Sequence, residues 1–134
     1  MGTWGAGSFD NDTAADWVYG LERASGYAWV EETLAPVARG EHLDDPYDGE
    51  VAIAAAEVVA TAGGFPGPNV PPEVHAWAAR EGVPPAPLRS LAARAVRAVR
   101  DASELRAMWD EQSPEPWLEA TADLVRRLGA AAEP

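Results

Sequence analysis

Four side chains near the N-terminus carry the oxygen atoms that a hard metal ion prefers: Asp10, Asn11, Asp12 and Asp16. Carboxylates this close in sequence could hold Mg²⁺ or Ca²⁺. A calcium loop counted from Asp10 fails, however, because alanines occupy the fifth and sixth positions, where an acceptor and a glycine are required. We therefore favour a second interpretation, in which Asp10 or Asn11 caps a helix and the other acids lie near its positive end.

A second acidic segment, residues 42–50, fails the same test. Counted from Asp44, later positions fit a calcium loop in part, but Pro46 takes a ligand position and Ala55 stands where the closing Glu is required. The segment is more typical of a helix start, with Asp44 or Asp45 as the cap and Pro46 in the first turn. We predict no metal site from either segment, and no pattern in the chain predicts a cofactor.

Glu57 is the third residue with chemical potential. It lies in the middle of residues 50–62, a segment dominated by Ala and Val. A helix without a polar stripe has to be covered by neighbours on most sides, so this carboxylate is expected in the core. A buried charge without a partner is costly, and we predict an ion pair with Arg94 or Arg97, or a hydrogen bond from an indole. The alternative is a general acid/base, but the sequence places neither histidine beside it.

Several kinds of chemistry are excluded by what the sequence lacks. There is no cysteine, which removes thiol nucleophiles and thiolate metal sites and fits a reducing compartment. There is no lysine, which removes phosphate loops of the Walker type and Schiff-base catalysis. The N-terminal residues show no secretory signal, and no apolar run approaches the roughly 20 residues that span a bilayer. We expect a cytoplasmic protein, and we predict no catalytic residue.

The charge is acidic and unevenly distributed. The formal net charge is −12, which disfavours nucleic acid and acidic membrane surfaces as partners. Residues 1–85 carry fourteen Asp and Glu against three Arg, whereas residues 86–134 carry eight against seven. We favour the interpretation that an Arg-rich helix near residues 89–106 docks against acidic helices of the same domain. The other interpretation is an acidic face that meets a basic protein partner.

The apolar spacing predicts an all-α fold. Helical stripes recur in the stretches around residues 14–21, 27–37, 74–78, 88–102, 105–109 and 117–128, in addition to the central segment. Pro36 should kink or end the second helix, and Gly129 should end the last one. No strand or repeat is evident. We predict a single helical domain over residues 1–134: a bundle of about six or seven helices around a central Ala/Val-rich helix, with an irregular Gly/Trp arm at the N-terminus.

The six tryptophans divide into two groups. Four lie on apolar helical stripes, where core packing is the expected role. Trp29 lies off the stripe of its helix and Trp4 lies in the Gly-rich arm, so these two are the better candidates for contact with a partner, since aromatic residues are enriched at protein interfaces. We group them with the acids Asp10, Asp12 and Asp16 as candidate partner-binding residues.

Three blocks of sequence resemble a known family. The opening W-G-A-G-S-F-D-N-D of residues 4–12, followed by the Asp-Trp pair at residues 16–17, resembles the W-G-x-G-x-F-x-N-D…D-W motif of an uncharacterised bacterial domain-of-unknown-function family. The A-A-A-E-V-V of residues 54–59 and the S-E-L…W of residues 103–109 also match that family. Together the blocks cover nearly the whole chain. The resemblance implies a small bacterial domain, and it supplies no activity and no catalytic residues.

Two functional hypotheses follow. The first is a non-catalytic interaction module that binds a basic protein through an acidic, partly aromatic surface of the N-terminal half. A small antidote to a toxin would have this profile, by analogy alone. The second is a metal-assisted hydrolase that uses Asp10, Asp12 and Asp16, with Glu57 as a further carboxylate.

Overall fold

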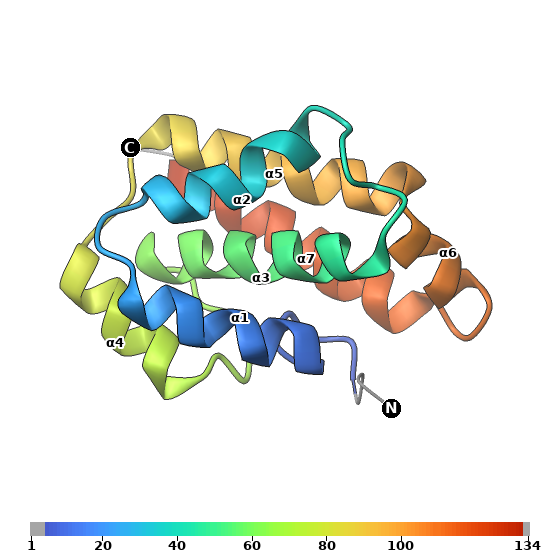
Figure 1. Ribbon diagram of the computed structural model, residues 1–134, viewed down its shortest axis with the longest axis horizontal. Coiled ribbons are helices and arrows are strands. Elements are labelled where there is room, and N and C mark those ends of the chain that lie inside the picture. The colour runs from blue at the N-terminus through green and yellow to red at the C-terminus, as the bar shows by residue number, and fades with distance from the viewer. Residues whose placement is uncertain (1–4, 133–134) are drawn as a thin grey trace.

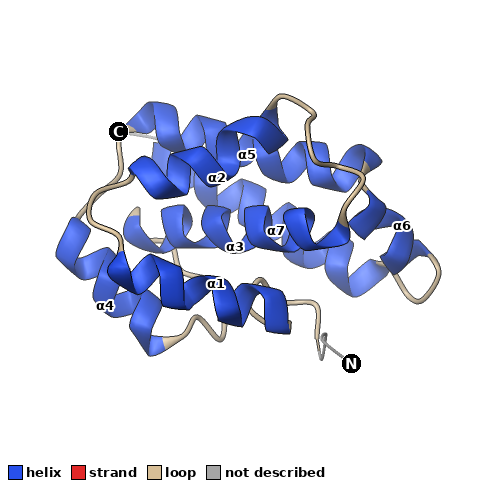
Figure 2. Cartoon of the chain, viewed as in Figure 1, coloured by secondary structure: helices blue, strands red, loops and turns tan. Residues whose placement is uncertain are grey.

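Seven α-helices make up the fold of residues 5–132, the part of the chain that the computed structural model describes, and no strand occurs among these residues (Figures 1 and 2). The prediction of an all-α fold is confirmed, and residues 5–11 form the irregular arm that precedes the first helix. The helices are α1 (Asp12–Arg23), α2 (Ala28–Ala38), α3 (Pro46–Ala62), α4 (Pro72–Glu81), α5 (Ala86–Ala102), α6 (Glu104–Asp110) and α7 (Glu115–Ala132).

Side-chain caps begin three of these helices. Asn11 Oδ1 accepts a hydrogen bond of 2.7 Å from the backbone N–H of Ala14 at α1, and Asp45 caps α3, with Pro46 in the first turn as predicted. Ser103 caps α6. The prediction that α7 ends at Gly129 is wrong, because the helix continues to Ala132. A helix-interior glycine costs only about 1 kcal/mol, and the alanines that follow are strong helix formers.

Helix α3 is the centre of the fold. It packs against α1, α2, α4, α5, α6 and α7, and its residues from Ala52 to Thr61 are all buried. Figure 1 shows α3 running through the middle of the molecule, with α1 and α2 on either side of it and α5 and α7 behind. The many alanines of α3 allow its neighbours to approach closely, so a helix with no polar stripe is covered as its sequence requires.

The remaining helices complete this packing. Helix α5 packs against α2, α3 and α7 through a face that contains Leu88, Ala92, Val96 and Val99. Helix α4 closes one end of the bundle against α1 and α3. None of the helices within residues 5–132 combines the length and the apolar character needed to cross a membrane.

Candidate functional site

Glu57 forms the most extensively bonded polar site among the described residues. Its side chain is 4% exposed, and both of its carboxylate oxygens are held by Arg127 of α7 in a fork, with Nη1–Oε2 at 2.7 Å and Nη2–Oε1 at 2.9 Å. Ser8 Oγ donates to Oε1 at 3.1 Å and the backbone N–H of Gly67 donates to Oε2 at 3.1 Å. A bidentate guanidinium with two further donors satisfies a buried carboxylate almost completely.

Arg127 is itself fixed by other groups. Its Nε donates to Asp123 Oδ2 at 2.7 Å and its Nη1 also donates to the carbonyl of Phe65 at 3.0 Å. Burial disfavours the charge of the guanidinium, but hydrogen bonds and attraction from Glu57 and Asp123 outweigh burial and raise the pKa of Arg127. The same hydrogen bond from Arg127, helped by the charges of Arg127 and Arg126, lowers the pKa of Asp123 despite partial burial.

The predicted buried ion pair of Glu57 therefore exists, but the predicted partners are wrong. Arg94 and Arg97 are exposed on α5, and the partner is Arg127, 70 residues along the chain from Glu57. The physical reason is the orientation of α5, whose apolar face is turned to the core while Arg94 and Arg97 lie on its exposed side. Arg127 lies next to the core position Leu128, and its apolar stem allows the guanidinium to reach inward.

The glycines of the arm allow its backbone to fold tightly around Asp10. The carboxylate oxygen Oδ2 of Asp10 accepts from the N–H of Gly7 at 3.0 Å. A Cβ added at Gly5 would lie 2.5 Å from this oxygen, and one at Gly7 would lie 2.7 Å from it. This fold turns the hydroxyl of Ser8 toward Glu57 and buries Phe9. The arm thus covers the ion pair between α3 and α7.

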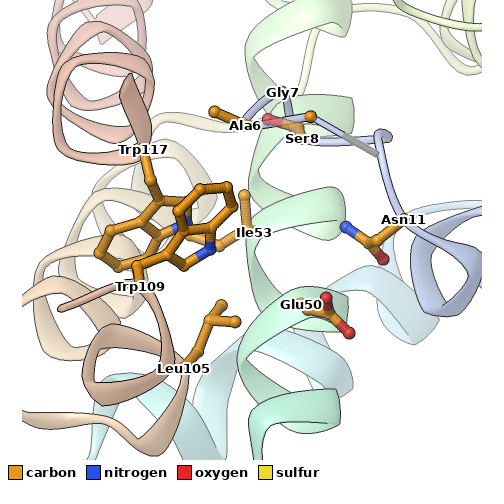
Figure 3. A pocket seen from close by; sticks show the side chains of 10 residues that line it. Ala6, Gly7, Ser8, Asn11, Glu50, Ile53, Leu105, Trp109 and Trp117 are labelled. Carbon is orange, nitrogen blue, oxygen red and sulfur yellow. The ribbon is translucent and has the colours of Figure 1, made fainter. Parts of the chain in front are cut away.

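A small cavity lies beneath the arm (Figure 3). The rings of Trp109 (α6) and Trp117 (α7) stack on one side of it, with centroids 6.4 Å apart and an interplanar angle of 11°, and Glu50 and Asn11 lie on the other side. The cavity volume is about 10 Å³, which is room for roughly one water molecule. Pockets for small-molecule ligands are about 300 Å³ or larger, so the cavity does not admit a substrate in this conformation.

The acidic cluster of the first helix does not converge on a common point. Asp10 is turned back into the arm, whereas Asp12 and Asp16 are exposed on α1. Across residues 5–132, no three side chains of the types that bind metals are grouped so that they could hold an ion. The proposed hydrolase therefore has no assembled set of ligands in the described part of the chain, and Glu57, its further carboxylate, is bound to Arg127.

The exposed side of α1 presents acids and an aromatic ring together, with the exposed Arg23 in the last turn. Asp12, Asp16, Tyr19 and Glu22 are all exposed there, Tyr19 to 65%; we call these four residues the acidic face. No carboxylate of α1 or α2 forms an ion pair within the described residues. The favoured interpretation, that the Arg-rich helix docks against acidic helices of the same domain, holds for its position, because α5 packs against α2 and α3. Within the described residues, however, no ion pair joins α5 to either helix. Among the described residues, one ion pair joins an arginine of the C-terminal part (residues 86–132) to an acid of the N-terminal part (residues 5–85), and it is Arg127–Glu57.

The turn between α1 and α2 is tied to the end of α4. Tyr27 donates its hydroxyl to the carbonyl of Gly82, and Glu81 accepts from the N–H of Gly26 at 2.8 Å. Burial, with a smaller effect of the Glu81 charge, raises the pKa of Tyr27 from 10.0 to about 12. Hydrogen bonds from Arg80 and from the Gly26 backbone lower the pKa of Glu81.

Of the two tryptophans predicted to contact a partner, Trp4 lies outside the described residues. Trp29 is half-buried and stacks on Trp17 of α1. The sequence reasoning did not identify Tyr19 or Arg127. Tyr19 could have been found from its spacing, because it follows Asp12 and Asp16 at i+7 and i+3 on one side of the helix. Arg127 could have been found only as a charge adjacent to the apolar stripe of α7.

The chain belongs to a family described as a domain of unknown function (DUF4259), whose sequence model matches residues 2–120. The resemblance to an uncharacterised family is thus confirmed at the level of the family. Searches of curated proteins and of solved structures give no significant match.

Proposed function

We propose that this chain is a non-catalytic protein-interaction module of the bacterial cytoplasm that binds a basic protein through the acidic face of α1. The observation that carries the proposal is that the carboxylates of this face are exposed and have no ion-pair partner among the described residues. Charges left in water are available to a partner, and they steer the encounter with a surface of opposite sign.

The exposed Tyr19 supports the same proposal. A phenol ring offers apolar area and a hydrogen-bonding group at low cost in side-chain entropy, which is why tyrosine is common where proteins meet. At 65% exposure it is among the most exposed large apolar side chains of the described residues, and it lies between Asp16 and Glu22 on the helix. An antidote that covers a basic toxin is one class of protein that would use such a face.

The test is recovery of bound proteins from an extract of the native host with the purified domain. The variant Asp16→Asn/Glu22→Gln removes two charges from the acidic face. The matched control, Glu111→Gln/Glu119→Gln, removes two exposed charges from the C-terminal half. We expect a basic protein that is recovered by the wild type and by the control, is lost from the acidic-face variant, and is released by salt.

Equal recovery by the two variants would place the contact elsewhere on the molecule. Recovery that does not respond to salt would contradict the electrostatic basis of the proposal.

A further inference from the structure

Two tryptophans connect α1 and α2 across the surface of α3. The rings of Trp17 (α1) and Trp29 (α2) are stacked, with centroids 4.9 Å apart and an interplanar angle of 10°. The tip of the Trp29 ring lies against Gly20, where an added Cβ would come within 2.6 Å of it. Trp17 is buried with 9% of its surface exposed, whereas Trp29 is half-buried. The missing side chain at Gly20 therefore leaves room for the indole of Trp29, which the sequence pattern places off the apolar stripe of its helix.

A surface groove opens beside this stack. Its lining includes Trp17, Trp29, Glu32, His42, Asp48 and Val51, and its volume is about 300 Å³; we call it the tryptophan groove. Three helices contribute to this lining: α1 provides Trp17, α2 provides Glu32, and α3 provides Asp48 and Val51. Trp29 and Glu32 also border a second hollow, whose lining includes Arg23, Ala24 and Ser25. The groove has the volume of a small ligand pocket, unlike the cavity beneath the arm.

Among the described residues, the lining of the groove combines indole surface and the carboxylates Glu32 and Asp48 with one imidazole, His42, and contains no arginine. Neither Glu32 nor Asp48 forms an ion pair within the described residues. A cation over an indole ring is attracted by the quadrupole of the ring, and a carboxylate beside the ring adds a hydrogen-bonded ion pair. This combination favours a cation and repels an anion, which gives the groove a defined charge complementarity.

We propose that the tryptophan groove binds an arginine side chain of the basic partner, with the guanidinium stacked on the exposed part of Trp29 and paired with Glu32. This inference rests on the proposed function and names the chemistry of the partner. Arginine fits better than lysine because the planar guanidinium stacks on an aromatic ring and is more weakly hydrated than an ammonium. The site provides the two features that distinguish the cations, a flat ring and carboxylate oxygens beside it.

The test uses two capped peptides of equal length and charge, one alternating arginine with glycine and the other lysine with glycine. Binding at low salt is measured by calorimetry, and the indole N–H signals of the protein are followed by NMR. We expect the arginine peptide to bind more tightly and to shift the signals of Trp29 and Trp17. The variant Glu32→Gln should weaken binding by about two- to fivefold, the range for an exposed ion pair.

The matched control is Glu31→Gln, which removes the same charge from the adjacent exposed position of α2, outside the lining of the groove. Equal weakening by Glu31→Gln and Glu32→Gln would overturn the groove and leave the acidic surface as the binding region. Equal affinity for the two peptides, or no binding of either, would also overturn the groove. The proposed function is judged separately, by the recovery experiment with the acidic-face variant.

Discussion

Breaking the ion pair between Glu57 and Arg127 should have the largest effect on stability of any single change to a charged residue that the structure suggests. Arg127→Met keeps the apolar stem of the side chain and removes the guanidinium, so it leaves the Glu57 carboxylate, 4% exposed, with only Ser8 and Gly67 as donors among the described residues. Removing one partner of a buried pair costs about 3 to 5 kcal/mol, because the other charge stays buried without compensation. That is a large part of a typical domain stability of about 5 to 15 kcal/mol.

The assay is urea unfolding followed by far-UV circular dichroism. With a slope of about 2 kcal/mol/M, the midpoint of Arg127→Met should fall by about 1.5 to 2.5 M. The matched control is Arg126→Met: Arg126 is the neighbouring residue, its side chain is 71% exposed, and among the described residues it pairs only with Asp123. An exposed pair of this kind contributes about 0 to 1 kcal/mol. If Arg127→Met does not fold, Arg127→Lys keeps the charge without the fork and should retain an intermediate stability.

A double-mutant cycle isolates the pair from the rest of the site. Glu57→Gln keeps the shape of the side chain and removes its charge, so in that background Arg127→Met no longer strands a buried anion. The cost of the second change should therefore fall by at least about 1 kcal/mol relative to the wild-type background. Free energies of unfolding of Arg127→Met and Arg126→Met that agree within about 0.5 kcal/mol, or a coupling energy near zero, would refute the reasoning.

Four further outcomes are expected. Tyr27→Phe should reduce the loss of stability at alkaline pH: a pKa raised to about 12 means that the contribution of Tyr27 is complete below pH 10 and is lost as the pH rises toward 12, which unfolding midpoints from pH 8 to 11.5 would show. The contribution of Asp123 has the opposite sign, because its lowered pKa gives stability above the ordinary carboxyl range that is lost on acidification, and Arg127→Met should weaken this acid dependence in melts from pH 6 to 2.5. Asn11→Ala removes the cap of α1 and should lower the free energy of unfolding by about 0.5 to 2 kcal/mol, as measured by urea unfolding. Asn11→Asp keeps a side-chain acceptor at this position and should retain most of that stability. Thermal melts with and without Mg²⁺, Mn²⁺ or Ca²⁺ should coincide, and an ion present at about a hundred times its dissociation constant that added about 2.7 kcal/mol would restore the hydrolase hypothesis.

The sequence predicted those features that depend on neighbours along the chain. The caps at Asn11 and Asp45 are set by hydrogen bonds over two or three residues, and the proline after Asp45 reinforces the second of them. The burial of α3 followed from composition alone, because a rod of alanine and valine leaves no polar side for water. Both inferences needed only local periodicity and the chemistry of helix ends.

The sequence could not predict which helices face one another. Arg94 and Arg97 were chosen as partners of Glu57 because positive charge is dense around them, yet pairing depends on how a helix is rotated about its axis. The apolar face of α5 fixes that rotation and directs these arginines to solvent. The stack of Trp17 on Trp29 was missed for the same reason: it depends on Gly20, which leaves room for an indole arriving from another helix.

The opening block of the chain and the acidic face of α1 differ in what their polar groups contact. In the block, the Asp10 carboxylate, the Asn11 amide and the Ser8 hydroxyl each bond within the fold. Their contacts close the arm over Glu57 and start α1, so a change in any of them should alter stability before it alters binding. The acids of the α1 face contribute no ion pair within the described residues, so their replacement should alter binding with little effect on stability. Measuring both quantities on the same variants separates the residues that build this fold from those that the fold presents to a partner.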